Sequence, residues 1–189
     1  MFSIDDALAG VVASSTQPVL GAIRLAWWRE ALERLDANPP PPEPRLQTVA
    51  AELLPRGVSG KELAGLEAGW AALLEEVPDM AKVGERGALL FRLGARLLGV
   101  ESIDETIGKA GRLFASVDVS RRGFAAIASD GPGSTRTKVR RRLRPLTAFA
   151  SLAARDLRRR GPPFEPEATP GRAVTLIRHR LFGIVSLAD

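Results

Sequence analysis

An arginine interrupts the apolar face of the helix that residues 18–36 predict. At about 100° per residue, Arg24 falls in the middle of the arc formed by the tryptophans and leucines of this segment. An isolated charge in a protein interior is very costly, so an inward-facing guanidinium needs a carboxylate, the carbonyls of a helix C-terminus or a ligand anion. Two roles stay open for Arg24: a structural ion pair, with Asp5 or Asp6 as its partner, or a contact with a ligand or a partner protein.

Two adjacent tryptophans, Trp27 and Trp28, lie on the same expected helix. Their large apolar surfaces favour a place in the core, or as a lid over it, more than a place in a cofactor site. Because they share the apolar arc with Arg24, both are also candidates for contact with a ligand or a partner.

Few other residues offer catalytic chemistry. The chain has no cysteine, which excludes disulfides, thiolate metal sites and a cysteine nucleophile. Its only histidine, His179, stands between two arginines, a setting that favours a surface position or a helix C-terminus over a general base. Residues 129–134, SDGPGS, lack the lysine and the preceding strand of a phosphate-binding loop. These residues alone therefore predict no catalytic site.

Charge is distributed unevenly along the chain. Residues 1–105 hold 10 lysines and arginines against 16 acidic residues, whereas residues 106–189 hold 17 against 6. A basic C-terminal half predicts either an anionic partner, such as a membrane surface, a diphosphate, a nucleic acid or an acidic protein, or a solvated basic surface. Basic residues gather at 136–144 and 155–160, with no aromatic side chain in either run to stack on bases, which disfavours nucleic acid.

The sequence predicts a succession of helices, and these helices carry the candidate residues. Ala, Leu, Arg and Glu dominate the composition, and β-branched and aromatic residues are sparse, which favours helix over sheet. Apolar periodicity and capping signals, including capping boxes at 59–62 and 102–105, predict helices over residues 4–12, 18–36, 46–54, 59–77, 80–98, 102–117, 145–160 and 172–187. A Pro-rich connector occupies residues 37–45.

The sequence therefore predicts an all-α, single-domain helical bundle over residues 1–189, of about seven to nine helices. No segment alternates well enough to predict a strand. The sequence shows no signal peptide and no apolar run of the ~18 residues that a membrane span needs. We expect a cytoplasmic protein that could contact a membrane at its surface.

Parts of the chain resemble a known enzyme family. The stretch TQPVLGAIRLAWWREALERLD (residues 16–36) is similar to the squalene/phytoene synthase family, most of all to its divergent branch, which includes the mitochondrial complex I assembly factor and small bacterial homologues. Residues 107–118 resemble the family's second aspartate-rich helix, and residues 143–157 resemble a later helix. The resemblance implies a helical bundle of the isoprenoid synthase type, shortened at its N-terminus relative to the family.

Active members of that family join two prenyl diphosphates head to head, with Mg²⁺ held by two facing aspartate-rich helices. Carboxylates at positions i and i+4 lie on one helix face and can share such ions. Asp5 and Asp6 stand where the resemblance places the first of these helices, but the positions four residues later hold Ala9 and Gly10. Asp5 and Asp6 are therefore interpreted as vestigial metal ligands.

The second of these helices also departs from the family pattern. Val119 stands in place of an aspartate, and Gly123 occupies the position four residues later. Arg112 replaces a glutamine of the family. Asp118 remains, with Arg122 four residues later. Both metal clamps are therefore incomplete, and synthase activity is not expected.

We expect a non-catalytic protein of the squalene/phytoene synthase type, without a cofactor, that acts as a binding or assembly factor for a partner protein or binds a prenyl or lipid ligand. Its candidate binding residues are Asp5, Asp6, Arg24, Trp27, Trp28 and Arg112.

Two alternatives stay open. The first is a Mg²⁺-dependent prenyl diphosphate transferase of isoprenoid biosynthesis, which requires that carboxylates from two helices converge on one pocket. The carboxylates available for this are Asp5, Asp6, Glu30, Asp104 and Asp118. The second is a protein that binds an anionic membrane, or a nucleic acid, through its basic surface.

Overall fold

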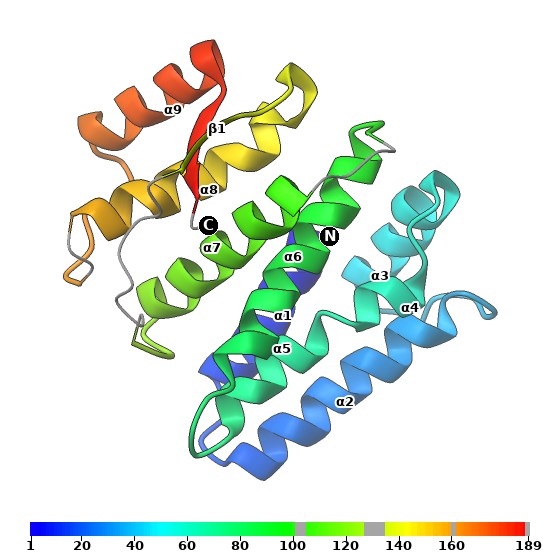
Figure 1. Ribbon diagram of the computed structural model, residues 1–189. Helices are drawn as coiled ribbons and strands as arrows, with labels where there is room; N and C mark the ends of the chain where they lie inside the picture. Colours follow the sequence, from blue (N-terminus) through cyan, green and yellow to red (C-terminus); the bar gives the residue numbers. More distant parts are fainter. Residues whose placement is uncertain (101–104, 127–134, 160–161, 188–189) are drawn as a thin grey trace.

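The computed structural model describes residues 1–100, 105–126, 135–159 and 162–187 (Figure 1). Within these ranges the chain is mostly helical, with one two-stranded antiparallel sheet near the C-terminus. The prediction of an all-α protein is confirmed.

The first part of the chain contains two long helices and a series of short ones. In chain order these elements are α1 (Phe2–Ala13), α2 (Pro18–Arg34), α3 (Pro44–Thr48), the π-helical turn η1 (Val49–Leu53), the 3₁₀ turn η2 (Leu54–Arg56), α4 (Gly60–Ala64), α5 (Glu67–Ala71) and the 3₁₀ turn η3 (Ala72–Leu74). Residues 35–43 connect α2 to α3 without regular secondary structure.

The second part of the chain contains four long helices and the two strands. Its elements are α6 (Met80–Leu97), α7 (Glu105–Arg121), β1 (Thr135–Lys138), the 3₁₀ turn η4 (Arg141–Leu143), α8 (Arg144–Arg158), α9 (Pro170–Phe182) and β2 (Ile184–Leu187). The strands pair in register, with Thr135 opposite Leu187 and Lys138 opposite Ile184.

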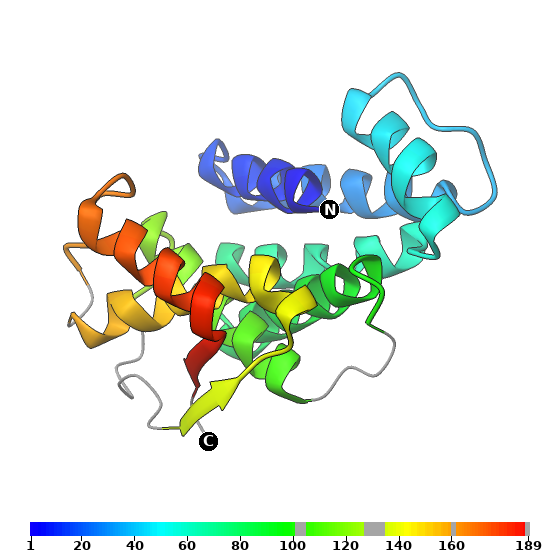
Figure 2. The ribbon, with the colours of Figure 1, turned by 90° about the horizontal axis from the view of Figure 1, so that it is seen from above.

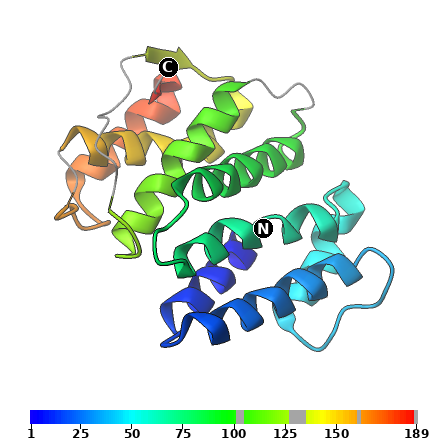
Figure 3. The same cartoon turned by 60° about the horizontal axis from the view of Figure 1, so that its bottom comes forward.

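Helices that follow one another in the sequence are mostly neighbours in space, as in the series α5, α6, α7, α8 and α9. Figures 1 and 3 show α2 and α9 at opposite ends of the molecule, with α6 and α7 side by side between them. In Figure 2, α1 and α2 form a layer on one side of α5 and α6. One apolar core cluster joins α1, α2 and the short helices to α6 and α7, and a second joins α6, α7, α8 and β2.

The contact between α6 and α7 depends on two glycines. A Cβ atom added to Gly87 would overlap the carbonyl oxygen of Gly111, and one added to Gly111 would overlap the carbonyl of Gly87. The two backbones can approach so closely only because both positions lack a side chain. This crossing brings the charged residues of α6 next to those of α7.

The end of the chain differs from its prediction. The helix expected over residues 172–187 ends at Phe182, because Gly183 adopts a left-handed conformation with φ of 68°. A Cβ atom at Gly183 would also lie 2.6 Å from Nε of Arg144. Residues 184–187 form strand β2, which pairs with β1, so the expectation of no strand is wrong. Strands of four residues are too short to show an alternating pattern in the sequence.

The predicted helix over residues 59–77 is interrupted. Its capping box is confirmed, because the Ser59 hydroxyl accepts from the backbone N–H of Glu62 and the Glu62 carboxylate accepts from the backbone N–H of Ser59. The helical segments end at Leu74, however, and Val77 is exposed. The capping box at 102–105 and the loop at 129–134 involve positions outside the described residues.

Candidate functional site

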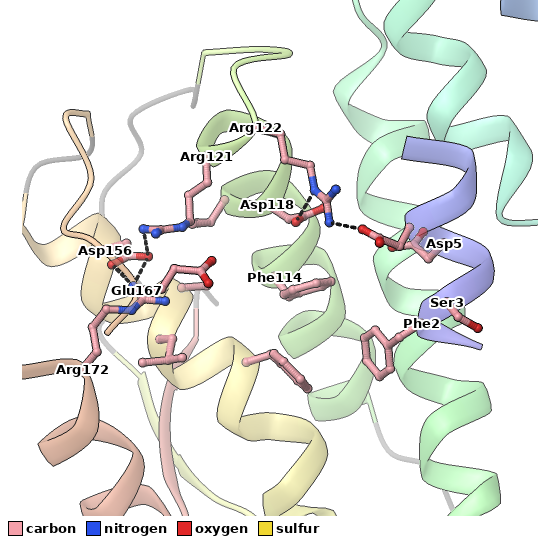
Figure 4. A pocket seen from close by; sticks show the side chains of 15 residues that line it. Phe2, Ser3, Asp5, Phe114, Asp118, Arg121, Arg122, Asp156, Glu167 and Arg172 are labelled. Carbon is pink, nitrogen blue, oxygen red and sulfur yellow. Dashed lines mark hydrogen bonds and ion pairs between the residues drawn. The ribbon is translucent and has the colours of Figure 1, made fainter. Parts of the chain in front are cut away.

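A pocket of about 690 Å³ opens between α1, α7 and α8, beside the N-terminus of α9 (Figure 4). Its apolar lining consists of Phe2, Phe114, Val117, Phe149, Leu152 and Ala153. Its charged lining consists of Asp5, Asp6, Asp118, Arg121, Arg122, Asp156, Glu167 and Arg172. Its volume lies within the range of about 300–1,000 Å³ that is usual for ligand pockets.

Three phenylalanines from three helices form one wall of the pocket. The ring centroids of Phe2 and Phe149 lie 5.2 Å apart, those of Phe114 and Phe149 lie 5.8 Å apart, and those of Phe2 and Phe114 lie 6.3 Å apart. These are normal distances for contacting aromatic rings. We call Phe2, Phe114 and Phe149 the phenylalanine wall. Phe149 is 43% exposed, so the wall offers apolar surface to a ligand.

A buried ion pair lies at the bottom of the charged side. Both carboxylate oxygens of Asp5 accept from Nη1 of Arg86 at 3.0 Å, and Oδ1 also accepts from the indole Nε1 of Trp70 at 2.8 Å. The guanidinium carbon of Arg86 lies 3.9 Å from the centroid of the Trp70 ring. Asp5 and Arg86 are almost completely buried, so the partners of Asp5 replace the water that a carboxylate loses on burial.

Two arginines join the carboxylates of Asp5 and Asp6 on α1 to that of Asp118 on α7. Nη2 of Arg86 lies 3.3 Å from Oδ2 of Asp118. Arg122 donates from Nε to Oδ1 of Asp118 at 2.9 Å and from Nη2 to Oδ1 of Asp6 at 3.0 Å. Arg122 can do this because it lies four residues after Asp118, in the turn directly after α7, where its backbone N–H still donates to the carbonyl of Asp118. Each of the three carboxylates therefore already contacts a guanidinium.

Burial and charge act in opposite directions on these groups. Burial raises the pKa of the Asp5 carboxyl, and the Arg86 guanidinium and the Trp70 indole oppose that rise. In Arg122, burial acts to lower the pKa, but the hydrogen bonds and charges of Asp118 and Asp6 outweigh it and raise the pKa overall. Arg122 thus stays charged on the lining of the pocket.

A second charged cluster lies on the opposite side of the pocket, as Figure 4 shows. The carboxylate of Asp156 accepts from Nη1 of Arg172 at 2.7 and 2.9 Å, and from Nη1 of Arg121 at 3.1 Å. Arg121 also donates to the backbone carbonyl of Glu165 at 3.1 Å. This cluster connects α7, α8 and α9, so the pocket has charged residues at both sides and aromatic rings between them.

The carboxylates that line the pocket do not fit a Mg²⁺ cluster as they are arranged. Mg²⁺ needs several oxygen ligands in nearly octahedral geometry. Here Arg86 and Arg122 lie against the oxygens of Asp5, Asp6 and Asp118 that would have to face the ion. Over the described part of the chain, no group of three or more His, Cys, Asp or Glu side chains is placed to hold a metal.

Arg24 does not lie in the interior, and this expectation is wrong. Its side chain is exposed and donates from Nη1 to the Ser14 hydroxyl at 3.0 Å. The buried face of α2 is centred on Leu25, Trp28 and Leu32. The predicted arc included apolar residues that are in fact exposed, and this shifted its centre onto Arg24.

The other candidates divide between the pocket and positions outside it. Asp5 and Asp6 line the pocket. Trp28 belongs to the core, whereas Trp27 packs edge to face on it at 5.3 Å and is 50% exposed. Arg112 forms ion pairs with Glu85 and Glu105. Arg24, Trp27, Trp28 and Arg112 do not line the pocket.

The sequence analysis missed several of the residues that build the pocket. The most informative is Arg86, which falls between Leu90 and Leu93 on a wheel at about 100° per residue. By the same rule as for Arg24, an arginine at this place on an apolar helix face needs a carboxylate partner. Asp156 and Arg172 gave no such signal, because they are distant in sequence and meet only through the packing of α9 on α8.

Among the described residues, no helix is long and apolar enough to cross a membrane.

No family model, curated protein or solved structure matches the chain.

Proposed function

We propose that this chain is a non-catalytic binding protein of the squalene/phytoene synthase type, whose pocket holds a prenyl or lipid chain. The observation that carries the proposal is the phenylalanine wall, an exposed apolar surface inside a pocket of ligand size. The contacts of the facing carboxylates of α1 and α7 support a non-catalytic role. Arg86 and Arg122 neutralise their charge, which Mg²⁺ would do in an active synthase.

The charge of the pocket indicates which head group it accepts. Its described lining contains five acidic residues and three arginines. A diphosphate would therefore meet more negative than positive charge in the absence of a metal ion. We expect an uncharged ligand, such as a prenyl alcohol, to bind more tightly than the corresponding diphosphate.

The test compares farnesol with farnesyl diphosphate by isothermal titration calorimetry without Mg²⁺. Farnesol should bind with a stoichiometry of one, and farnesyl diphosphate more weakly. Phe149→Ser should weaken farnesol binding by roughly tenfold or more, because burying one Phe side chain contributes about 1.5–3 kcal/mol. Trp27→Ser is the matched control, since Trp27 is also a half-exposed aromatic residue but lies outside the pocket. Equal binding by both variants, or no binding of farnesol to the wild type, contradicts the proposal.

One observation favours the transferase alternative. Asp5 and Asp6 of α1 and Asp118 of α7 line the same pocket, as that alternative requires. Glu30 lies on α2 and does not line it, and Asp104 is outside the described residues. The alternative requires that Mg²⁺ displace Arg86 and Arg122 from these carboxylates.

Release of diphosphate from farnesyl diphosphate in the presence of Mg²⁺ distinguishes the two functions. Our proposal predicts no release above the rate without protein. It also predicts none from Arg122→Gln, which frees Asp6 of its ion pair. Release that depends on protein and is abolished by Asp118→Asn establishes the transferase instead.

A further inference from the structure

The last helix of the fold has its apolar side turned outward. Its two buried residues are Arg172 and His179. In contrast, Val174, Ile177 and Leu181 are 54%, 58% and 63% exposed. At spacings of three and four residues they lie on one face of α9. We call these three residues the outer stripe.

Polar contacts hold the inner face of α9 on the body of the protein. Arg172 pairs with the buried carboxylate of Asp156. Nε2 of His179 lies 3.0 Å from the hydroxyl of Thr147, and Nδ1 lies 3.1 Å from the carbonyl oxygen of Ile184. His179 is thus at the helix C-terminus, as expected, but it is buried rather than at the surface. The helix packs without using its apolar side, which stays exposed.

Arginines border the outer stripe on both sides. On a wheel at about 100° per residue, Arg178 and Arg180 fall about 70–90° to either side of the stripe. Beside Arg178, a hollow of about 430 Å³ is also lined by Arg136 and Arg158. Beside Arg180, a hollow of about 720 Å³ is also lined by Arg141 and Arg144.

Among the described residues, these arginines have no acidic partner, although Arg144 donates to the backbone carbonyls of Arg180 and Leu181. Within the described part of the chain, no acidic residue lines either hollow, and no carboxylate forms an ion pair with any of the six arginines. Burial lowers the pKa of Arg158, and repulsion from Arg136, Arg155 and Arg178 lowers it further. An anion in this hollow would relieve that repulsion.

We infer that α9 is a docking surface for an anionic lipid bilayer. The outer stripe would enter the boundary between head groups and acyl chains, and the arginines on both sides would contact lipid phosphates. An apolar stripe with flanking arginines is the pattern of helices that lie in a membrane interface. Figures 1 and 3 show α9 at the edge of the molecule, where a flat surface can reach it.

A bilayer explains both features of this surface at once. An acidic protein would use the arginines, and a second copy of the chain would use the stripe. A nucleic acid would use the arginines but would leave Val174, Ile177 and Leu181 exposed to water. An anionic bilayer is amphipathic and negatively charged, so it uses the stripe and the arginines together.

The test is flotation of the full chain with vesicles of phosphatidylcholine, with and without phosphatidylglycerol. The wild type should bind only the vesicles that contain phosphatidylglycerol, and binding should fall as salt rises. Ile177→Glu/Leu181→Glu should weaken binding by about tenfold or more, because the stripe would become polar and negative. Arg178→Gln/Arg180→Gln should weaken it less, through the loss of two charges.

The matched control is Val19→Glu/Ile23→Glu on α2, which alters two exposed apolar residues at the other end of the molecule. This variant should bind vesicles as the wild type does. Circular dichroism checks that all variants stay folded, which is expected because every altered side chain is exposed.

Three outcomes overturn the inference. The first is no vesicle binding at low salt, and the second is equal loss in the α2 control. The third is a dimer in solution that Ile177→Glu/Leu181→Glu dissociates, because the stripe would then be an interface between copies. The test is independent of the pocket, since Phe149→Ser leaves α9 unchanged and should not affect flotation.

Discussion

At the scale of single residues, the Asp5–Arg86 pair is the central structural contact of the pocket. Arg86 contacts carboxylates of both α1 and α7 and the ring of Trp70. Its Nε atom is buried without a hydrogen-bond partner among the described residues. The stability of the buried Arg86 guanidinium therefore depends on the carboxylates of Asp5 and Asp118. Removing one member of such a pair leaves a buried charge without compensation.

Arg86→Met should therefore destabilise the protein strongly. We expect a loss of about 3–5 kcal/mol in the free energy of unfolding, measured with urea. The double variant Asp5→Asn/Arg86→Met should recover part of this loss, because the buried charge of Asp5 is removed as well. Arg96→Met is the control: its ion pair with Glu62 is partly exposed and contributes about 0–1 kcal/mol. A loss below that of the control would show that Arg86 is not a structural cross-link.

Arg24 and Arg86 show how far the sequence can predict such contacts. The rule that a buried arginine needs a partner holds for Arg86 on α6 and does not apply to Arg24 on α2, which is exposed. On α2 the apolar arc is wider than the buried face, because its members Leu20 and Trp27 are exposed. On α6 the arc and the buried face coincide, and Arg86 lies within them. Only tertiary packing determines which part of an apolar arc is covered.

At the scale of elements, the crossing of α6 and α7 aligns the charged cluster. Gly87→Ala should force the two helices apart at the carbonyl of Gly111. We expect a loss of about 1–3 kcal/mol in stability, as in other overpacked cores, although alanine is the better helix former. Gly10→Ala on α1, where a Cβ atom meets nothing within 4 Å, should be neutral or stabilising in the same unfolding experiment. Destabilisation by both variants alike would contradict this account.

The connector before α9 is held by Glu165. Its carboxylate accepts from Thr169, Arg155 and Arg159. The hydrogen bond from Thr169 is the largest of the effects that lower its pKa to about 2, followed by the hydrogen bond and charge of Arg155. Because this pKa is lower in the folded protein than in the unfolded chain, Glu165 stabilises the fold above pH ~4.5 and loses this effect as the pH falls towards ~2.

Glu165→Gln should therefore lower the melting temperature at about pH 7 and have a much smaller effect at about pH 3. Thermal unfolding followed by circular dichroism at both values checks this. Thr169→Val should move the pH dependence to higher pH, because it removes the largest contribution to the low pKa. A difference between Glu165→Gln and wild type that is the same at both pH values would contradict the assignment.

The sequence predicts long helices better than their short neighbours. Residues 80–98 predict α6 closely, because apolar periodicity and Gly99 agree on its extent. The predicted helix at 172–187 is too long, since the turn at Gly183 and the pairing of β2 with β1 depend on a distant segment. The pocket could not be predicted as a whole, because it combines residues of α1, α7, α8 and α9.

At the scale of the whole molecule, the pocket and the outer stripe are neighbours. A hollow along α8 and α9 is lined by Phe149 and Leu152, which also line the pocket, and by Leu176. Leu176 in turn lines the basic hollow beside Leu181. Leu176 thus lines both the hollow next to the pocket and the basic hollow next to the outer stripe.

The central claim is that the pocket binds an isoprenoid without converting it. Native mass spectrometry of the full chain with farnesol, farnesyl diphosphate and Mg²⁺ tests it most directly. We predict a one-to-one complex with intact farnesol, which Phe149→Ser loses and Trp27→Ser keeps, and no new isoprenoid product. A bound product larger than farnesyl diphosphate, or no complex with either compound, would contradict the account.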